Sequence, residues 1–328
     1  MKRTVICVVL ILATVSLLFA RGASESAETY PKRAIDLVCA GSAGSGGDTL
    51  ARVIAIYLGE ELGVTVNVIN TAGGSGIPAV QSVLDAAPDG YTLMADQGYS
   101  SSFQYALDPG SIPYDIVKDR RYIAKISSGP QVLCGSANME WTDIRDVARY
   151  LKEGNYKEFY WGGISPSSAA NFAFLQFCLA YGIDFSNFKE IRYTGGGDIL
   201  AAIAGGHISI GSCAASGVFS YVQDNLVLPL VVCGPARLAS LPNVPSAAEL
   251  GLDTLTADFW IGISGRADLP EYVVTTIDNA AQRVIKNDRF LADIAKIGAV
   301  VNYVGPHDMQ KAIVDEGAMV IELVKLGQ

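Results

Sequence analysis

Residues 35–52 read IDLVCAGSAGSGGDTLAR and contain a strand, a glycine-rich turn and the start of a helix in one short stretch. The apolar residues before Cys39 predict the strand, and Asp48 opens a helical pattern. Glycine is used where the backbone needs a positive φ or a close approach, and the first amides of a helix have no partner inside the helix. The stretch therefore predicts an α/β unit whose turn can hold an anion on backbone amides.

The same unit continues through the first third of the chain. Alternating valines at 64–68 predict a strand, NTAGGSG at 70–76 is a second glycine-rich turn, and a helix is expected over 77–86. A tight turn at 88–90 leads into a strand at 91–95. Strands and helices that alternate in this order predict a parallel sheet.

A second α/β region follows, with helices at its end. The predicted elements are a strand at 159–162, the loop ISPSS at 164–168, a helix at 169–180, a strand at 191–193, the loop TGGGD at 194–198, a helix at 199–204, a strand at 228–233, and helices at 271–287 and 308–326. Both loops follow a strand and precede a helix. They therefore belong to the carboxyl end of their sheet, where open α/β folds bind ligands.

The N-terminus has the features of a secretory signal peptide, which we assign to residues 1–23. Lys2 and Arg3 precede an apolar run at 4–19, and the cleavage point stays open within the small residues at 20–23. A run of about 16 residues is shorter than the ~20 that span a bilayer, which disfavours a membrane anchor. We therefore expect a periplasmic protein from which this segment has been removed.

Charge and cysteine usage restrict the partners. The chain has 24 basic and 33 acidic residues and a formal net charge of −9, which disfavours nucleic acid as a partner. Beyond the signal peptide it contains Cys39, Cys134, Cys178, Cys213 and Cys233, none in CxxC spacing. We expect these thiols to be buried small hydrophobic groups rather than disulfides or metal ligands.

The first glycine-rich loop does not match the two common phosphate-binding signatures. A Walker loop needs a lysine where Asp48 stands, and a dinucleotide fingerprint needs an acidic residue where Asn70 ends the second strand. A weaker anion such as a carboxylate fits the loop better. The alternative that the loop is only a tight turn stays open.

Catalytic and metal-binding residues are scarce. The chain has His207 and His307, both more consistent with structural roles than with catalysis, and Ser165 in GISPS lacks the glycine that closes a nucleophile elbow. No histidine cluster suggests a metal site. The sequence therefore predicts no catalytic residue, no metal and no cofactor.

Eight segments, in order, resemble the Bug-type substrate-binding receptors of tripartite tricarboxylate transporters. They are CAGSAGSGGDTLAR, VNVINTAGGSG, APDGYTLM, IPYDIVKD, FYWGGISPSSAANF, RYTGGGDILAAIAGGHI, LPNVPSAAELGL and DFWIGI. The resemblance covers essentially the whole exported chain. It implies the periplasmic-binding-protein type II fold, an α/β architecture of two α/β domains joined by two crossover strands with a ligand cleft between them.

The alternation of strands and helices is interrupted near residues 125–128 and 257–262, where we place the crossovers. The first domain is then 30–127 together with 259–328, and the second is 128–258. The resemblance further implies that the two domains enclose a small organic carboxylate, which the receptor delivers to the membrane subunits of a tripartite tricarboxylate-type transporter. We expect a monomer.

The residues that hold the carboxylate follow from the resemblance, which places them in the first loop and in the serine-rich and glycine-rich loops of the second domain. The candidate ligand-binding residues are Ser42, Ala43, Gly44, Ser45, Gly46, Asp48, Gln97, Ser165, Ser167, Ser168, Thr194, Gly195, Gly196 and Asp198. Four positions depart from the family's usual residues: Ala43 replaces a proline, Thr71 an arginine, Ser168 a histidine and Thr194 a basic residue. Fewer positive groups favour a singly or doubly charged acid over citrate.

Asp48 needs a separate assignment, because a carboxylate beside a bound anion would repel it. We expect it to cap its own helix by accepting amides two or three residues on. The alternative is that it accepts a hydrogen bond from the ligand. Side chains at Gly44 or Gly46 are expected to block the approach of a carboxylate to the amides.

Two other functions stay open. A periplasmic sensor would use the same cleft and pass occupancy to a signalling partner. A periplasmic hydrolase or isomerase would use Asp48 or Asp198 as a base, although no paired acid and base is indicated.

Overall fold

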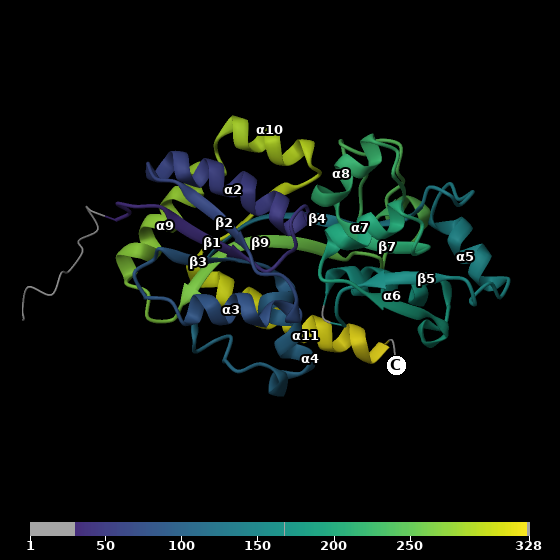
Figure 1. Cartoon of the computed structure of the whole chain (residues 1–328), viewed down its shortest axis with the longest axis horizontal. Coiled ribbons are helices and arrows are strands. Elements are labelled where there is room, and N and C mark those ends of the chain that lie inside the picture. Colours follow the sequence, from purple (N-terminus) through teal and green to yellow (C-terminus); the bar gives the residue numbers. More distant parts are fainter. Residues whose placement is uncertain (1–29, 167, 327–328) are drawn as a thin grey trace, which may run out of the picture.

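Two α/β lobes lie side by side along the long axis of the molecule (Figure 1). The computed structural model describes residues 30–326 except Ser167, so the predicted signal peptide at 1–23 lies outside the described residues. Among the described residues, ten strands form one continuous sheet. Within the same part of the chain, no helix combines the length and the apolar character that crossing a bilayer requires.

The first lobe is built on three parallel strands, as predicted. Strand β1 (Ile35–Cys39) pairs on one side with β2 (Val66–Asn70) and on the other with β3 (Thr92–Asp96). Helices α2 (Gly46–Leu62) and α3 (Ile77–Leu84) connect them. The loop after β1 therefore leaves the sheet between two neighbours, whereas the loop after β2 leaves it at the edge.

Helix α2 begins and ends at recognisable signals. Ser45 is its N-cap and accepts a hydrogen bond from the backbone N–H of Asp48, and Gly63 ends the helix with a φ of 69°. Leu50, Ile54 and Leu58 recur at intervals of four residues and are buried against the sheet.

Two long strands connect the lobes. Strand β4 (Arg120–Ser136) pairs antiparallel with β9 (Asp258–Arg266) from Arg120 to Pro130. From Gln131 onward, β4 pairs instead with strands of the second lobe. The strand passes from one lobe into the other without a break. The residue bounds of the two domains stay a prediction.

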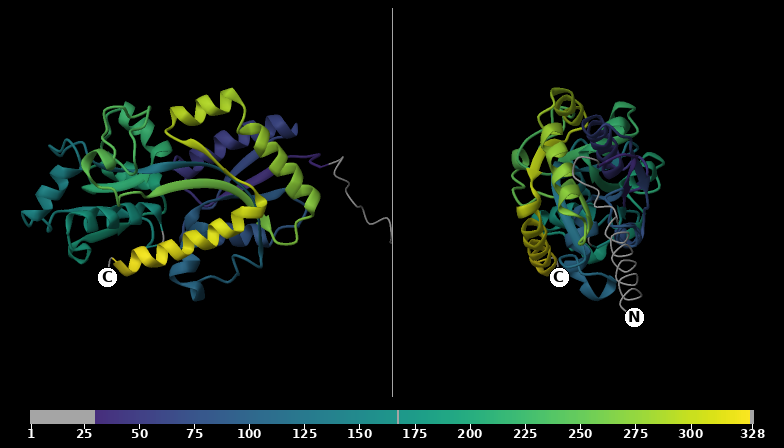
Figure 2. Two further views of the ribbon diagram at one scale, coloured as in Figure 1. Left: turned by 180° about the vertical axis from the view of Figure 1, so that it is seen from behind. Right: turned by 90° about the vertical axis from the view of Figure 1, so that its left-hand side faces the viewer.

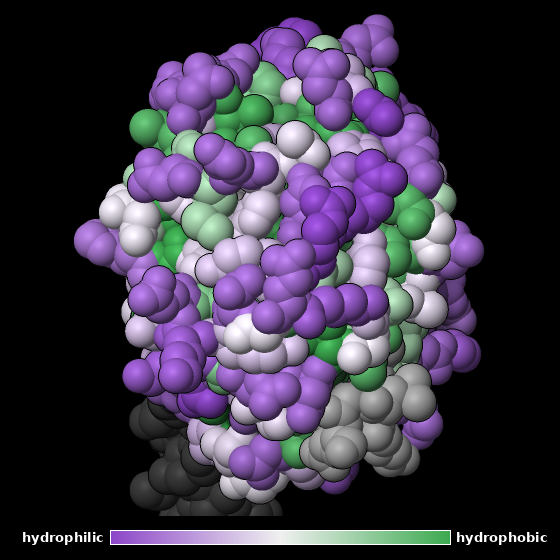
Figure 3. Space-filling view, turned by 90° about the vertical axis from the view of Figure 1, so that its right-hand side faces the viewer, coloured by the Kyte–Doolittle hydropathy of each residue, from purple (hydrophilic) through white to green (hydrophobic). Residues whose placement is uncertain are grey.

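The second lobe packs helices on both faces of its part of the sheet. Its elements are α5 (Ile144–Lys152), β5 (Tyr160–Gly163), α6 (Ala169–Tyr181), β6 (Lys189–Arg192), α7 (Gly196–Ala204), β7 (Ile210–Ala214), α8 (Ala215–Gln223) and β8 (Val227–Val232). An aromatic core fills it, with the rings of Trp161 and Phe174 stacked at 4.6 Å between centroids. The end face beyond α5 is mostly hydrophilic (Figure 3).

The chain then returns to the first lobe. Helices α9 (Glu271–Val284) and α10 (Asp288–Lys296) lead into β10 (Val300–Val304), which pairs antiparallel with β4. Helix α11 (Pro306–Leu326) runs back along the molecule beneath the second lobe (Figure 2). Val320 on α11 joins the hydrophobic core that contains Trp161, so this helix contacts both lobes.

Short helical segments complete the chain. They are Gly74–Gly76, Tyr99–Phe103, α4 (Gln104–Leu107), Pro109–Ser111, Phe185–Asn187 and Ala248–Leu250. The single helix predicted over 271–287 is wrong in extent, because α9 ends at Val284 and Asn287 caps α10 through its side-chain oxygen. Helix α8 was not predicted.

Candidate functional site

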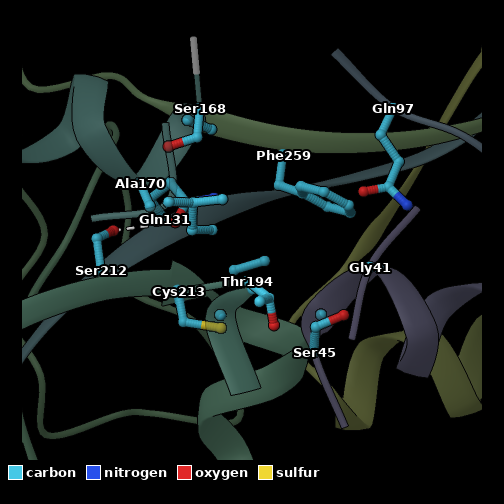
Figure 4. A pocket seen from close by; sticks show the side chains of 17 residues that line it. Gly41, Ser45, Gln97, Gln131, Ser168, Ala170, Thr194, Ser212, Cys213 and Phe259 are labelled. Atoms are coloured by element: carbon cyan, nitrogen blue, oxygen red, sulfur yellow. Dashed lines mark hydrogen bonds between the residues drawn. The ribbon is translucent and has the colours of Figure 1, made fainter. Parts of the chain in front are cut away.

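A cavity lies between the two lobes (Figure 4). The space open to the centre of a water molecule is about 50 Å³. Its lining residues are Gly41, Ser45, Gly46, Gly47, Gln97, Gln131, Ile164, Ser168, Ala169, Ala170, Thr194, Gly195, Gly196, Ser212, Cys213, Ala214 and Phe259. Both lobes and both crossing strands contribute, so the cavity exists only where the lobes meet.

The N-terminal ends of four helices line this cavity. Gly46 is the first residue of α2, Ala169 of α6 and Gly196 of α7, while Ala214 directly precedes α8. Helix N-termini have unsatisfied N–H groups and partial positive charge. The cavity is therefore suited to an anion even though no cationic side chain lines it.

The polar side chains of the lining are neutral. Gln131 is 2 % exposed, and its Oε1 accepts a hydrogen bond from Ser212 Oγ at 2.9 Å, which leaves its amide N–H groups as donors. Gln97 donates through Nε2 to Cys39 Sγ at 3.4 Å and so presents a carbonyl oxygen. Burial raises the pKa of the Cys213 thiol to about 12, so this thiol is neutral near pH 7.

The two lobes are in contact across the cleft. Ser216 Oγ on α8 donates to the carbonyl oxygen of Gly46 at 3.2 Å. A Cβ on Gly46 would lie 2.5 Å from Ala214 Cβ, and a Cβ on Gly197 would lie 3.0 Å from the Ala43 carbonyl oxygen. Glycine at these positions allows the backbones to approach, and the structure represents the closed arrangement.

The structure corrects the expected role of Asp48. Ser45, not Asp48, is the N-cap of α2. Asp48 instead accepts hydrogen bonds from the Gly44 backbone N–H at 2.9 Å, from Asn70 Nδ2 at 2.9 Å and from Arg52 Nε at 3.0 Å.

Burial alone would raise the pKa of the Asp48 carboxyl. The hydrogen bonds from Arg52, Gly44 and Asn70 outweigh burial and hold this pKa below its usual value. Asp48 does not line the cavity, and Arg52 compensates its charge at 2.8 Å. The conflict between this carboxylate and a bound anion is thereby removed.

The structure brings together only part of the candidate set. Ser45, Gly46, Gln97, Ser168, Thr194, Gly195 and Gly196 line the cavity. The candidates that do not line it are Ser42, Ala43, Gly44, Asp48, Ser165 and Asp198, and Ser167 lies outside the described residues. Among the described residues the buried Ser42 Oγ has no hydrogen-bond partner, and it faces Gly195 of the opposite lobe.

Several lining residues were missed because they belong to strands rather than loops. Gln131 lies where β4 exchanges its pairing partners, Ser212 and Cys213 lie on β7, and Phe259 lies on β9. A polar residue within an otherwise apolar strand was the one available signal, and Gln131 in PQVLCG has it.

The five cysteines Cys39, Cys134, Cys178, Cys213 and Cys233 are free and buried, which confirms the expectation for them. Across residues 30–326 apart from Ser167, no group of histidine, cysteine and acidic side chains is arranged to hold a metal ion.

Comparisons with known proteins agree with this geometry. A family model described as "Tripartite tricarboxylate transporter family receptor" matches residues 50–326. The chain is 25 % identical over 297 residues to Protein BugT of Bordetella pertussis, covering 90 % of this chain and 89 % of BugT. It is 27 % identical over 286 residues to a UPF0065 protein of Cupriavidus necator, covering 85 % of this chain and 83 % of that protein.

Solved structures show the same fold. MatC of Rhodopseudomonas palustris with bound malate has a TM-score of 0.81 at 22 % identity, covering 90 % of this chain and 100 % of MatC. The periplasmic binding protein BugD has a TM-score of 0.82 at 22 % identity, covering 91 % of this chain and 98 % of BugD. The periplasmic-binding-protein fold is thereby confirmed, and the chain belongs to the receptor family of the tripartite tricarboxylate transporters.

Proposed function

We propose that this chain is a periplasmic receptor that closes around a small organic carboxylate and delivers it to the membrane subunits of a tripartite tricarboxylate-type transporter. The observation that carries the proposal is the convergence of four helix N-termini on one cavity whose side chains are all neutral. Such a site stabilises an anion without a full positive charge, which suits an acid of low charge. We expect monocarboxylates and dicarboxylates to bind more tightly than citrate.

Related proteins support the chemical class of the ligand. MatC was solved with malate, and another R. palustris protein with a TM-score of 0.83 at 22 % identity was solved with adipate. We further propose that the receptor is a monomer and binds its ligand without converting it.

Isothermal calorimetry against a panel of mono-, di- and tricarboxylates tests the binding function. Thermal unfolding is the parallel measurement, because a ligand that binds only the folded state stabilises it by about 2.7 kcal/mol at 100 times Kd. Mass spectrometry of acid retained through purification would identify the natural ligand. Absence of binding across the whole panel, or conversion of the bound acid, would contradict the proposal.

Delivery to a transporter needs a separate test. Uptake of the bound acid is measured in cells that express the two membrane subunits, with and without the receptor. We expect uptake to require both. If the receptor alters gene expression through a signalling partner and leaves uptake unchanged, the sensor function is correct instead.

A further inference from the structure

The second glycine-rich loop does not line the central cavity, although its sequence resembles that of the first loop. Gly73–Gly76 instead lines a separate cavity with Ile164, Tyr193 and Thr194 of the opposite lobe. Ile164 and Thr194 line both cavities, so the two cavities adjoin. A ligand held in the central cavity can therefore extend into the second.

The volumes favour such an extension. The central cavity offers about 50 Å³ to the centre of a water molecule, and the second offers about 110 Å³ on the same measure. One water needs roughly 10–15 Å³ of such space. The central cavity therefore holds a carboxylate with a short chain, and the room for the remainder of a longer acid lies beneath Gly73–Gly76.

The walls of the second cavity combine apolar surface with neutral hydrogen-bonding groups. Ile164 and the ring of Tyr193 provide the apolar surface, and the hydroxyl groups of Tyr193 and Ser75 provide polar contacts. The backbone amides at the start of the turn Gly74–Gly76 have no partner within the turn. Burial raises the pKa of Tyr193, so its hydroxyl is a donor near pH 7.

The nearby charge is negative. Thr194 donates a hydrogen bond to Asp198, and no ion pair of Asp198 is found within the described part of the chain. By contrast, the carboxylate of Asp48 is neutralised by Arg52. A second anionic group beside Thr194 would therefore be repelled, whereas an uncharged polar group would not.

We propose that this second cavity is a subsite for the uncharged, hydrogen-bonding tail of a linear monocarboxylate whose carboxylate lies in the central cavity. The inference rests on the proposed carboxylate-binding function and specifies its substrate class. It assigns Tyr193 and Ser75 to tail recognition and Asp198 to discrimination against a second negative charge.

Calorimetry with butyrate, hexanoate, ω-hydroxyhexanoate and adipate tests the subsite on the intact exported protein. We expect hexanoate to bind more tightly than butyrate because it buries more apolar surface. The terminal hydroxyl should add about three- to tenfold in affinity, as one neutral hydrogen bond does. Adipate, which has the same length, should bind more weakly than ω-hydroxyhexanoate.

Three variants separate the contributions. Tyr193→Phe should remove most of the hydroxyl advantage and leave butyrate affinity unchanged. Ser75→Gln should fill the cavity and weaken both six-carbon acids, again without affecting butyrate; Ser75 already has a φ of 53°, so the exchange adds no left-handed backbone strain. Asp198→Asn should narrow the difference between adipate and ω-hydroxyhexanoate.

The outcomes are distinguishable. If butyrate binds but chain length and the terminal hydroxyl bring no gain, the subsite is wrong and the carboxylate function stands. If the gain persists in both Tyr193→Phe and Ser75→Gln, the tail lies elsewhere and the subsite is also wrong. If no acid of any length binds, the carboxylate function fails and the subsite fails with it.

Discussion

The two glycine-rich loops of the first lobe have similar sequences and different surroundings. The loop Gly41–Asp48 contributes to the central cavity and packs against α7 and α8. The loop Gly73–Gly76 lies at a neighbouring cavity, where Gly74 is exposed. Strand β1 has neighbours on both sides, whereas β2 is the edge strand. The comparison teaches that the position of the preceding strand, rather than glycine content, sets how deeply a loop enters the cleft.

Gly46→Ala should have the largest effect and would break the comparison if it did not. Its Cβ would lie 2.5 Å from Ala214 Cβ and 2.7 Å from Ser216 Oγ, so the lobes could not close. We expect the Kd for any bound acid to rise at least about 100-fold, measured by calorimetry.

Gly44→Ala in the same loop is the matched control. A Cβ on Gly44 has no atom within 4 Å, so the expectation that a side chain there blocks the ligand is wrong in its steric reason. Its φ of 76° means that alanine costs about 1 kcal/mol of unfolding free energy while affinity stays within a few fold. Equal losses of affinity in both variants would show that closure is not limited by the contact between Gly46 and α8.

Asp48→Asn tests the bonds that attach the first loop to Asn70, which directly precedes the second loop. Hydrogen bonds hold the pKa of Asp48 below its usual value despite burial, so its ionised form stabilises the folded state. This contribution is present above about pH 4 and is lost as the pH falls through the folded-state value. We expect Asn to lower the unfolding free energy by about 1–3 kcal/mol near pH 7 and by less near pH 3.

Urea unfolding between about pH 3 and pH 8 makes the measurement. Asp36→Asn is the control, because Asp36 is exposed and also accepts a hydrogen bond from an asparagine, Asn67. If the two variants were equally stable at every pH, the Asp48 cluster would contribute nothing to the first loop.

Glu316→Gln sharpens the comparison by testing a support of the closed packing. Glu316 on α11 accepts a hydrogen bond from Trp260 Nε1 on β9 at 2.7 Å and another from Ser102. Burial raises the pKa of Glu316 to about 7, although these hydrogen bonds and Lys125 lower it. The protonated form is therefore favoured in the folded state.

Because the folded-state pKa is the higher one, the stability from this group is present at low pH and declines as pH rises from about 4.5 to 7. Glutamine should remove that decline and raise the unfolding free energy near pH 8 by roughly 1–3 kcal/mol. Chemical unfolding at pH 5 and pH 8 makes the comparison, with the exposed Glu140→Gln as control. A variant with the same pH dependence as the original protein would contradict the prediction.

Gly73→Ala should have the smallest effect. A Cβ on Gly73 has no atom within 4 Å, and its φ of 94° costs about 1 kcal/mol for alanine. Thermal unfolding should show this loss, while the affinity for a short acid such as butyrate changes less than about twofold. If Gly73→Ala weakened short acids as strongly as Gly46→Ala, the two loops would be equivalent and the contrast between them would disappear.

Much of the fold could be predicted because its signals are local. Strands β1 to β3 and helices α2, α3 and α6 appear near their expected positions. Helix α8 escaped prediction because it has no capping side chain and contains Gly217. A Cβ on Gly217 would lie 2.9 Å from the backbone nitrogen of Gly46, so this glycine serves the contact between lobes rather than the helix.

The sequence by itself determined the alternation of strands and helices, the glycine-rich and serine-rich loops at helix starts, and the scarcity of basic residues in them. Only the tertiary structure decided which loops share a cavity, that Gln131 and Phe259 complete it, and that Arg52 and Asn70 neutralise Asp48. The physical reason is the range of the interactions. Helix starts and turns depend on residues a few positions apart, whereas the cavity depends on strand order and on two strands that cross between the lobes, which bring distant residues into contact.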